Sequence, residues 1–259
     1  MTDIAKPKTI CVVTAGGPYP WIITNALGDR FGPIEVIVED PEPRGAFLRR
    51  RAKKQGWLSV AGQFATMTLV KAQKTRLAQR LRAIEEAHGL RPEPDPIHRV
   101  TRVPSANGPQ FIEAMKRIKP DVVLLVGCRI LKAETLRAIP CPVLNYHAGI
   151  TPAYRGVNGG YWALASGDAE NFGTTVHLVD DGVDTGGIIA QARGRPEPGD
   201  SIATYAHRFA AMSRELCADA VAAALEGRLR PKPASGPSRQ WFHPPVWRYL
   251  WNGVAKGIW

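Results

Sequence analysis

The chain has 259 residues, of which 44% are hydrophobic, and a formal net charge of +11. This length suits one large domain or one domain with an appendage, and the apolar content is enough for a buried core. The sequence has no run of about 18 uncharged apolar residues, which excludes a membrane-spanning helix. Its first eight residues have no apolar stretch typical of a secretory signal. The charge favours an anionic partner, such as a phosphorylated metabolite, a nucleic acid or a membrane surface.

The four cysteines, Cys11, Cys128, Cys141 and Cys217, form no CxxC pair, and three of them lie in or beside apolar runs. This pattern is typical of buried thiols in a cytosolic protein rather than of disulfides or a zinc site. We therefore expect a cytoplasmic protein without a metal site.

The N-terminal part of the chain predicts the start of an α/β sheet. Residues 9–13 form a short apolar run rich in β-branched side chains, which favours a buried strand. A turn with Gly16 and Gly17 follows and leads into a predicted helix at residues 21–27. Bare backbone amides at such a turn can bind a phosphate. Since no GxGxxG pattern follows, a plain tight turn and a substrate- or anion-binding turn both remain open.

The composition and the spacing of apolar residues change after a second predicted strand at residues 34–38. Residues 44–88 carry apolar side chains at spacings of three and four, which predicts helices, and they are rich in Lys and Arg with few acids. We interpret this segment as a basic helical insertion. A solvated surface, a surface for an anionic substrate and a surface for lipid head groups are all compatible with it.

Strands and helices alternate through the centre of the chain, at residues 97–100, 108–119, 121–126, 132–139 and 142–146. The clearest buried strand is the one at residues 121–126. It leads to Arg129, Ile130 and Leu131, at the carboxyl edge where open α/β sheets bind ligands.

The last of these strands ends in Asn145 and His147, whose side chains should point the same way because they are two residues apart. Asp184 lies in a tight acidic turn at residues 180–187, between strands predicted at 174–179 and 188–191. If the three side chains converge, the Asn amide can donate to an oxyanion, the His can donate or shuttle a proton, and the carboxylate can hold the His protonated.

The surroundings of this trio restrict the chemistry. No Ser or Cys nucleophile stands beside the His, and no second or third metal ligand lies at a useful spacing. The trio therefore suits direct attack of a substrate amine on an activated acyl carbon. From spacing alone, however, an Asn-x-His pattern at a strand edge is more often structural.

The C-terminal part begins with a long Ala-rich helix, predicted to end near residue 225, and continues as a tail rich in Pro, Arg and Trp. We predict a catalytic domain at residues 8–226, containing the insertion at 44–88, and a tail at residues 227–259. A tail laid over the domain, a peripheral membrane contact and the arm of a homodimer are all compatible with this composition.

Five stretches carry a more specific pattern, at residues 121–131, 144–156, 167–168, 173–186 and 198–200. The second reads Leu-Asn-Tyr-His-Ala-Gly-Ile-Thr-Pro-Ala-Tyr-Arg-Gly, and the fourth ends in Val-Asp-Asp-Gly-Val-Asp-Thr-Gly. Their order resembles the folate-dependent formyltransferase family, which includes the glycinamide ribonucleotide, methionyl-tRNA and sugar N-formyltransferases. The resemblance implies a Rossmann-like α/β fold, with a mostly parallel twisted sheet flanked by helices.

By position, the resemblance implies that Asn145, His147 and Asp184 are catalytic. It implies 10-formyl-tetrahydrofolate as the donor, without a metal. The implied cofactor contacts are Arg129, Ile130, Leu131, Val179, Asp180 and Val183. The predicted substrate contacts are Gly16, Gly17, Tyr154 and Arg155. The chain departs from the family at Ala148–Gly149, where Pro-Ser is usual, and the Gly is expected to widen or loosen the acceptor side.

We therefore expect an N-formyltransferase for a small, anionic primary amine, with a nucleotide-linked amino sugar as the first choice because basic residues suit its diphosphate. Glycinamide ribonucleotide, a hydroxylated ornithine and a lipid-linked amine remain alternatives, as does a hydrolase that releases formate. The non-catalytic alternative is a membrane- or anion-binding module on the same fold. A nucleic-acid partner is not expected, because the tail is too short for the tRNA-binding barrel of methionyl-tRNA formyltransferase.

Overall fold

In the computed structural model, which describes residues 8–259 without the side chains of Ala46, Lys74 and Thr75, the sheet is built around two buried strands. β1 (Ile10–Thr14) and β4 (Val122–Val126) are buried along their whole length. Because side chains alternate along a strand, apolar residues on both faces must be covered by helices, which explains the continuous apolar runs in the sequence. The N-terminal stretch in which we expected no secretory signal lies, up to residue 7, outside the described residues.

The described residues form a seven-stranded sheet in the order β3-β2-β1-β4-β5-β7-β8. The first five strands in this order run parallel, whereas β7 is antiparallel to both β5 and β8. The other strands of this sheet are β2 (Glu35–Glu39), β3 (Arg99–Val103), β5 (Val143–His147), β7 (Gly173–Leu178) and β8 (Ile188–Arg193). The predicted fold class, a mostly parallel α/β sheet, is confirmed.

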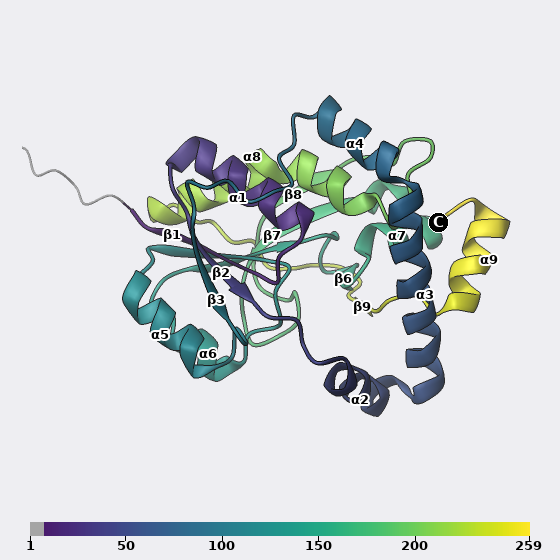
Figure 1. Cartoon of the computed structure of the whole chain (residues 1–259), viewed down its shortest axis with the longest axis horizontal. Helices are drawn as coiled ribbons and strands as arrows, with labels where there is room; N and C mark the ends of the chain where they lie inside the picture. The colour runs from purple at the N-terminus through teal and green to yellow at the C-terminus, as the bar shows by residue number, and fades with distance from the viewer. Residues whose placement is uncertain (1–7) are drawn as a thin grey trace, which may run out of the picture.

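Helices cover the two faces of this sheet as separate layers (Figure 1). α1 (Pro18–Phe31) and α8 (Tyr205–Leu225) pack on one face. α5 (Pro109–Ile118) and α6 (Ala133–Arg137) pack on the other. Each fully buried side chain in these layers, such as Phe111, contributes about 2 kcal/mol.

The basic insertion is helical, as the sequence predicted. It consists of α2 (Arg44–Gln55), α3 (Trp57–Arg76) and α4 (Ala78–Ala87). Gly56, which has a φ of 81°, separates α2 from α3, and this left-handed conformation is one that glycine adopts without strain. α3 runs along one flank of the molecule, apart from the sheet (Figure 1).

The tail folds back onto the segment that follows β5. β9 (Gln240–Trp241) pairs in parallel with β6 (Arg155–Gly156), and the ring of Trp241 stacks on Trp162 of α7 (Gly159–Ala165) at a centroid distance of 4.6 Å. A short 3-10 helix, η1 (Ala169–Asn171), lies between α7 and β7, and α9 (Val246–Lys256) follows β9. The tail thus contributes to an aromatic core cluster of the domain, and the proposed division at residue 226 stays a prediction.

Within residues 8–259, none of the helices has both the length and the apolar content needed to cross a bilayer.

Candidate active site

Asn145 and His147 lie at the carboxyl end of β5, and alternation along the strand places them on the same face of the sheet. This is the face covered by α5 and α6, because Val143, which alternates with them, belongs to the core cluster of that layer. The antiparallel neighbour β7 places His177 directly opposite Asn145. The site is therefore built where a parallel strand meets an antiparallel one.

The turn between β7 and β8 brings Asp184 back onto this face. Its Oδ1 accepts a hydrogen bond from Asn145 Nδ2 at 3.2 Å, and its Oδ2 lies 3.5 Å from His147 Nδ1. Oδ2 also accepts a hydrogen bond from the backbone N–H of Gly156 at 2.8 Å. The structure therefore brings the three predicted catalytic side chains together, while their roles in catalysis stay a prediction.

The environment keeps Asp184 ionised. Burial alone would raise the pKa of this carboxyl, but the charge of His147 and the hydrogen bond from the Gly156 backbone N–H lower it from 3.8 to about 2. At neutral pH, Asp184 is thus an anion among donors and a weak base. Asp184 adopts a left-handed backbone conformation with a φ of 51°, and its carboxylate lies beside Asn145 and His147.

The side chains of Asn145 and His147 on β5 both have hydrogen-bond partners within the site. His147 Nε2–H donates to the carbonyl oxygen of Tyr154 at 2.7 Å. Asn145 Nδ2 lies 3.0 Å from His177 Nε2, which accepts because the other ring nitrogen donates to Leu178 O at 2.6 Å. Since the second Asn145 N–H points to Asp184, an oxyanion in the site has to replace one of these acceptors.

The expectation that Gly149 widens the acceptor side is not what the structure shows. A Cβ at this position would lie 2.5 Å from the Tyr154 carbonyl oxygen and 2.7 Å from His147 Nε2. The missing side chain therefore lets the loop close tightly on His147, because the Tyr154 carbonyl occupies the space. The Gly therefore leaves no room for a side chain at this position of the loop.

The predicted cofactor contacts form two segments on the same face. Leu131 is buried and, like the half-buried Val179, packs against the core cluster beside Asn145, whereas Ile130 is 58% exposed. Asp180 accepts hydrogen bonds within its own turn, from Gly182 N and the Thr185 hydroxyl. Leu131 and Val179 are thus positioned as an apolar wall, and the Asp180 side chain shapes the turn.

Arg129 is held by a carboxylate that the sequence did not single out. Glu39, at the end of β2, is buried, and it accepts hydrogen bonds from the backbone amides of Arg129 and Ala106. Its Oε2 also lies 3.3 Å from Arg129 Nε, and the guanidinium donates to the carbonyl oxygen of Asp40. This network fixes the loop that follows β4, so Arg129 contributes to loop geometry.

The predicted substrate contacts divide into two groups. Gly16 and Gly17 lie after β1, with left-handed φ values of 80° and 98°, next to the loop that follows β4. Tyr154 is buried and donates its hydroxyl proton to Asp168 at 2.8 Å, so it offers the site a backbone carbonyl instead of its phenol. Arg155 donates to Val183 O at 2.7 Å and to the Ser238 hydroxyl at 2.9 Å, which ties the acidic turn to the tail.

Two site residues were missed at the sequence level, Glu39 and His177. The signal for His177 was its place in an alternating strand whose partner carries Asn145. Using this signal requires the antiparallel register, which pairs His177 with Asn145.

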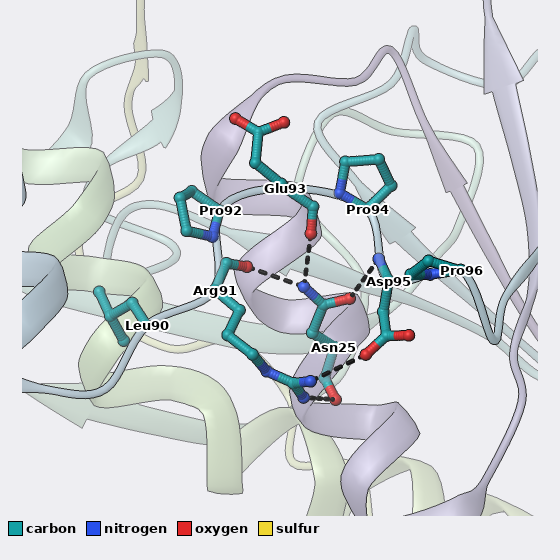
Figure 2. Close-up of a pocket in the computed structure, with 8 residues that line it drawn as sticks. All are labelled: Asn25, Leu90, Arg91, Pro92, Glu93, Pro94, Asp95 and Pro96. Atoms are coloured by element: carbon teal, nitrogen blue, oxygen red, sulfur yellow. Dashed lines mark hydrogen bonds and ion pairs between the residues drawn. The ribbon is translucent and has the colours of Figure 1, made fainter.

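A surface cavity of about 380 Å³ lies elsewhere, between Asn25 of α1 and the loop at residues 90–96 (Figure 2). The Asn25 amide donates to the carbonyl oxygens of Arg91 and Glu93, and its oxygen accepts from the amide of Asp95. The loop leads into the amino end of β3, opposite the carboxyl edge that carries the site. The polar groups of Asn25 and of the loop backbone bond to one another, so this cavity borders a loop that Asn25 fixes to α1.

Comparison with known proteins identifies the family and the fold. A family model described as formyl transferase matches residues 50–221. A methionyl-tRNA formyltransferase from Synechococcus sp. (strain JA-2-3B'a(2-13)) is 30% identical over 164 residues, which cover 63% of this chain and 48% of the relative. The chain thus spans about half the length of the curated relatives it matches.

Two solved structures share the fold. Glycinamide ribonucleotide transformylase 1 from Symbiobacterium toebii superposes with a TM-score of 0.56 at 23% identity, covering 90% of this chain and 92% of that one. An N-formyltransferase from Helicobacter canadensis, in complex with folinic acid and dTDP-3-aminofucose, has a TM-score of 0.54 at 14% identity, with 90% and 70% covered. The family model covers more than half of the chain, so the family predicted from the sequence is confirmed: this protein belongs to the formyl transferase family.

Proposed function

We propose that this protein transfers a formyl group from 10-formyl-tetrahydrofolate to a primary amine, and that the acceptor is a nucleotide-linked amino sugar. The observation that carries the proposal is the convergence of Asn145, His147 and Asp184 on one face of the sheet, within hydrogen-bonding or ion-pair distance. This set contains donors and an anion but no nucleophile, so it fits direct transfer between two substrates.

In the proposed reaction, the substrate amine forms a bond to the formyl carbon, the bond between that carbon and N10 of the folate breaks, and one amine proton ends on N10. Negative charge develops on the formyl oxygen. An N–H of Asn145 turns from His177 to this oxygen, and His147 supplies the second donor. The Oδ2 atom of Asp184 lies 3.5 Å from His147 Nδ1, so its proposed role is to hold this ring in place as a donor.

The segments around the site fit a pterin in their chemistry. Ile130 exposes apolar surface and Val179 is half-buried, whereas Leu131 is buried in the core cluster that supports them. The donor supplies the activated formyl group, whereas the protein orients it against Asn145. The Helicobacter canadensis enzyme, which shares the fold, forms a complex with folinic acid, and this supports a folate as the donor.

The acceptor class is supported by charge and by the same relative. The chain has a formal charge of +11, which suits the diphosphate of a sugar nucleotide. The Helicobacter canadensis complex holds dTDP-3-aminofucose. Arg155 and Tyr154 border the space next to His147, where the amine has to approach the formyl carbon.

The test is incubation with 10-formyl-tetrahydrofolate and a panel of amines, followed by mass spectrometry of the acceptor and absorbance of released tetrahydrofolate. The panel contains amino-sugar nucleotides, glycinamide ribonucleotide, hydroxyornithine and an aminoacylated tRNA. Formylation of another amine but of no amino sugar would refute the acceptor class, and formate release without an acceptor would identify a hydrolase. Asn145→Ala should lose about 3 kcal/mol of transition-state stabilisation, whereas Asp219→Asn, on exposed α8 surface, is the matched control.

A further inference from the structure

The C-terminal helix α9 presents its apolar stripe to solvent. Its exposed large side chains stand at i, i+3, i+4 and i+7, the spacing of one helical face. They are Trp247, Leu250, Trp251 and Val254, with exposures of 49%, 45%, 67% and 81%. The opposite face, which packs on the domain, contains Asn252 and Gly253. A surface helix of a water-soluble domain normally points its apolar stripe inward, so this stripe needs a partner.

Helix α3 extends the same surface. It exposes Trp57, Leu58, Phe64 and Leu69. The first turn of α9 packs against α3, because a Cβ on Gly62 of α3 would lie 2.6 Å from the ring of Trp247. At 100° per residue, Leu58 and Leu69 lie within about 40° of Gly62 around α3, directly beside this contact.

Leu58 and Leu69 of α3, together with the four exposed side chains of α9, form what we call the α3/α9 apolar surface. Trp57 and Phe64 lie about 140° and 160° from Gly62, on the other side of α3. Among the described residues, six of the eleven exposed large hydrophobic side chains belong to this surface. Figure 1 shows the two helices side by side on one flank of the molecule. Such a concentration on one flank is typical of an interaction site.

The two segments that carry this surface have charged side chains of a single sign. Residues 44–76, which form α2 and α3, contain nine Lys and Arg and no acidic residue. Residues 227–259, which include α9, contain six Lys and Arg and again no acidic residue. Arg44, Lys53 and Lys71 are among the exposed cations. An anionic partner matches this arrangement, whereas a second copy of the chain would bring like charges together.

The apolar stripe distinguishes between anionic partners. A nucleic acid would match the cations but would leave exposed Trp, Leu and Val side chains without an apolar environment. An anionic bilayer matches both, because Trp favours the membrane interface and Lys and Arg bind the lipid phosphates. We propose that the α3/α9 apolar surface and its flanking cations bind the surface of an anionic phospholipid membrane. The inference does not depend on the proposed reaction.

The experiment is co-sedimentation of the full chain with vesicles of phosphatidylcholine alone or mixed with phosphatidylglycerol, at low and high salt. We expect binding to the mixed vesicles, weaker binding at high salt, and a blue shift of tryptophan fluorescence. Trp251→Ser combined with Val254→Ser should lower the partition coefficient about tenfold or more. Both side chains are mostly exposed, so the fold should persist, which far-ultraviolet circular dichroism checks.

Ile97→Ser is the matched control, because Ile97 is 49% exposed but lies in the loop before β3. It should bind vesicles like the wild type. Arg44→Gln with Lys53→Gln should weaken binding to mixed vesicles roughly fivefold per charge. Three results would overturn the proposal: no vesicle binding, equal binding by the Trp251/Val254 variant, or a dimer in sedimentation velocity that this variant dissociates in the absence of vesicles.

Discussion

Removing the charge of Asp184 should change how the stability of the protein depends on pH. In the folded protein, the pKa of Asp184 lies at about 2, below its ordinary value of 3.8. A carboxyl with a lowered folded-state pKa stabilises the fold above its ordinary pKa, and this contribution is lost as the pH falls through the folded-state value. Asp184→Asn removes the carboxyl and therefore removes this part of the pH dependence.

The magnitude follows from the shift. A difference of somewhat less than two pKa units corresponds to about 2 kcal/mol of unfolding free energy. The Asp184 side chain is 14% exposed, so solvent screens this interaction only weakly. The difference in stability between the wild type and Asp184→Asn should thus shrink by about 2 kcal/mol between about pH 5 and about pH 2.

Urea denaturation of both proteins, followed by circular dichroism over this pH range, measures the difference. Comparing the two proteins cancels the contribution of the other carboxyl groups that titrate in acid. Asp181→Asn is the control, because Asp181 is exposed in the same turn and should show no such change. A constant difference between the wild type and Asp184→Asn across the pH range would show that the site does not stabilise the carboxylate.

Three further substitutions test the structure around the site by urea denaturation. Gly149→Ala should cost about 1 to 3 kcal/mol, because its Cβ would lie 2.5 Å from the Tyr154 carbonyl oxygen. Gly45→Ala should be neutral or stabilising, because its Cβ would make only an ordinary contact with the Arg49 guanidinium at 3.8 Å; equal effects would refute the tight loop. Glu39→Gln should cost roughly 2 kcal/mol or more, since it removes a buried charge that accepts from several donors, and an unchanged midpoint would contradict this network. Trp241→Ala should cost about 3 to 5 kcal/mol, and a loss under about 1 kcal/mol would mean that the tail is not part of the core.

The sequence predicted the central strands well because their physical signal is local. β4 is an uninterrupted apolar run, and burial on both faces requires such a run. The edge strand β3 begins two residues later than the predicted strand at 97–100, and three of its five residues are exposed. An edge strand carries a weak apolar pattern, so its limits depend on pairing with β2, which the local sequence does not specify.

The site was harder to predict because it depends on contacts between distant segments. Asn145 and His147 could be paired from their spacing alone, but Asp184 was assigned to them only through the family resemblance. The positions of His177 and Glu39 follow from strand pairing and from a loop-closing network that no spacing rule reveals. For Gly149, the family pattern suggested more space, whereas the approach of the Tyr154 carbonyl produced a tighter loop.

The tail connects the α3/α9 apolar surface to the Asp184 carboxylate through a short physical path. α9 is joined to β9 by residues 242–245, and β9 pairs with β6, where Gly156 N–H donates to Asp184. Arg155 adds a second link, because it bonds both Ser238 in the tail and Val183 beside Asp184. Any force that shifts α9 at a membrane would therefore act on the Gly156 N–H and on Arg155, which together hold the acidic turn at residues 180–187 in place. The rate of formyl transfer, measured with and without anionic vesicles, should then change in the wild type but not in the Trp251/Val254 variant.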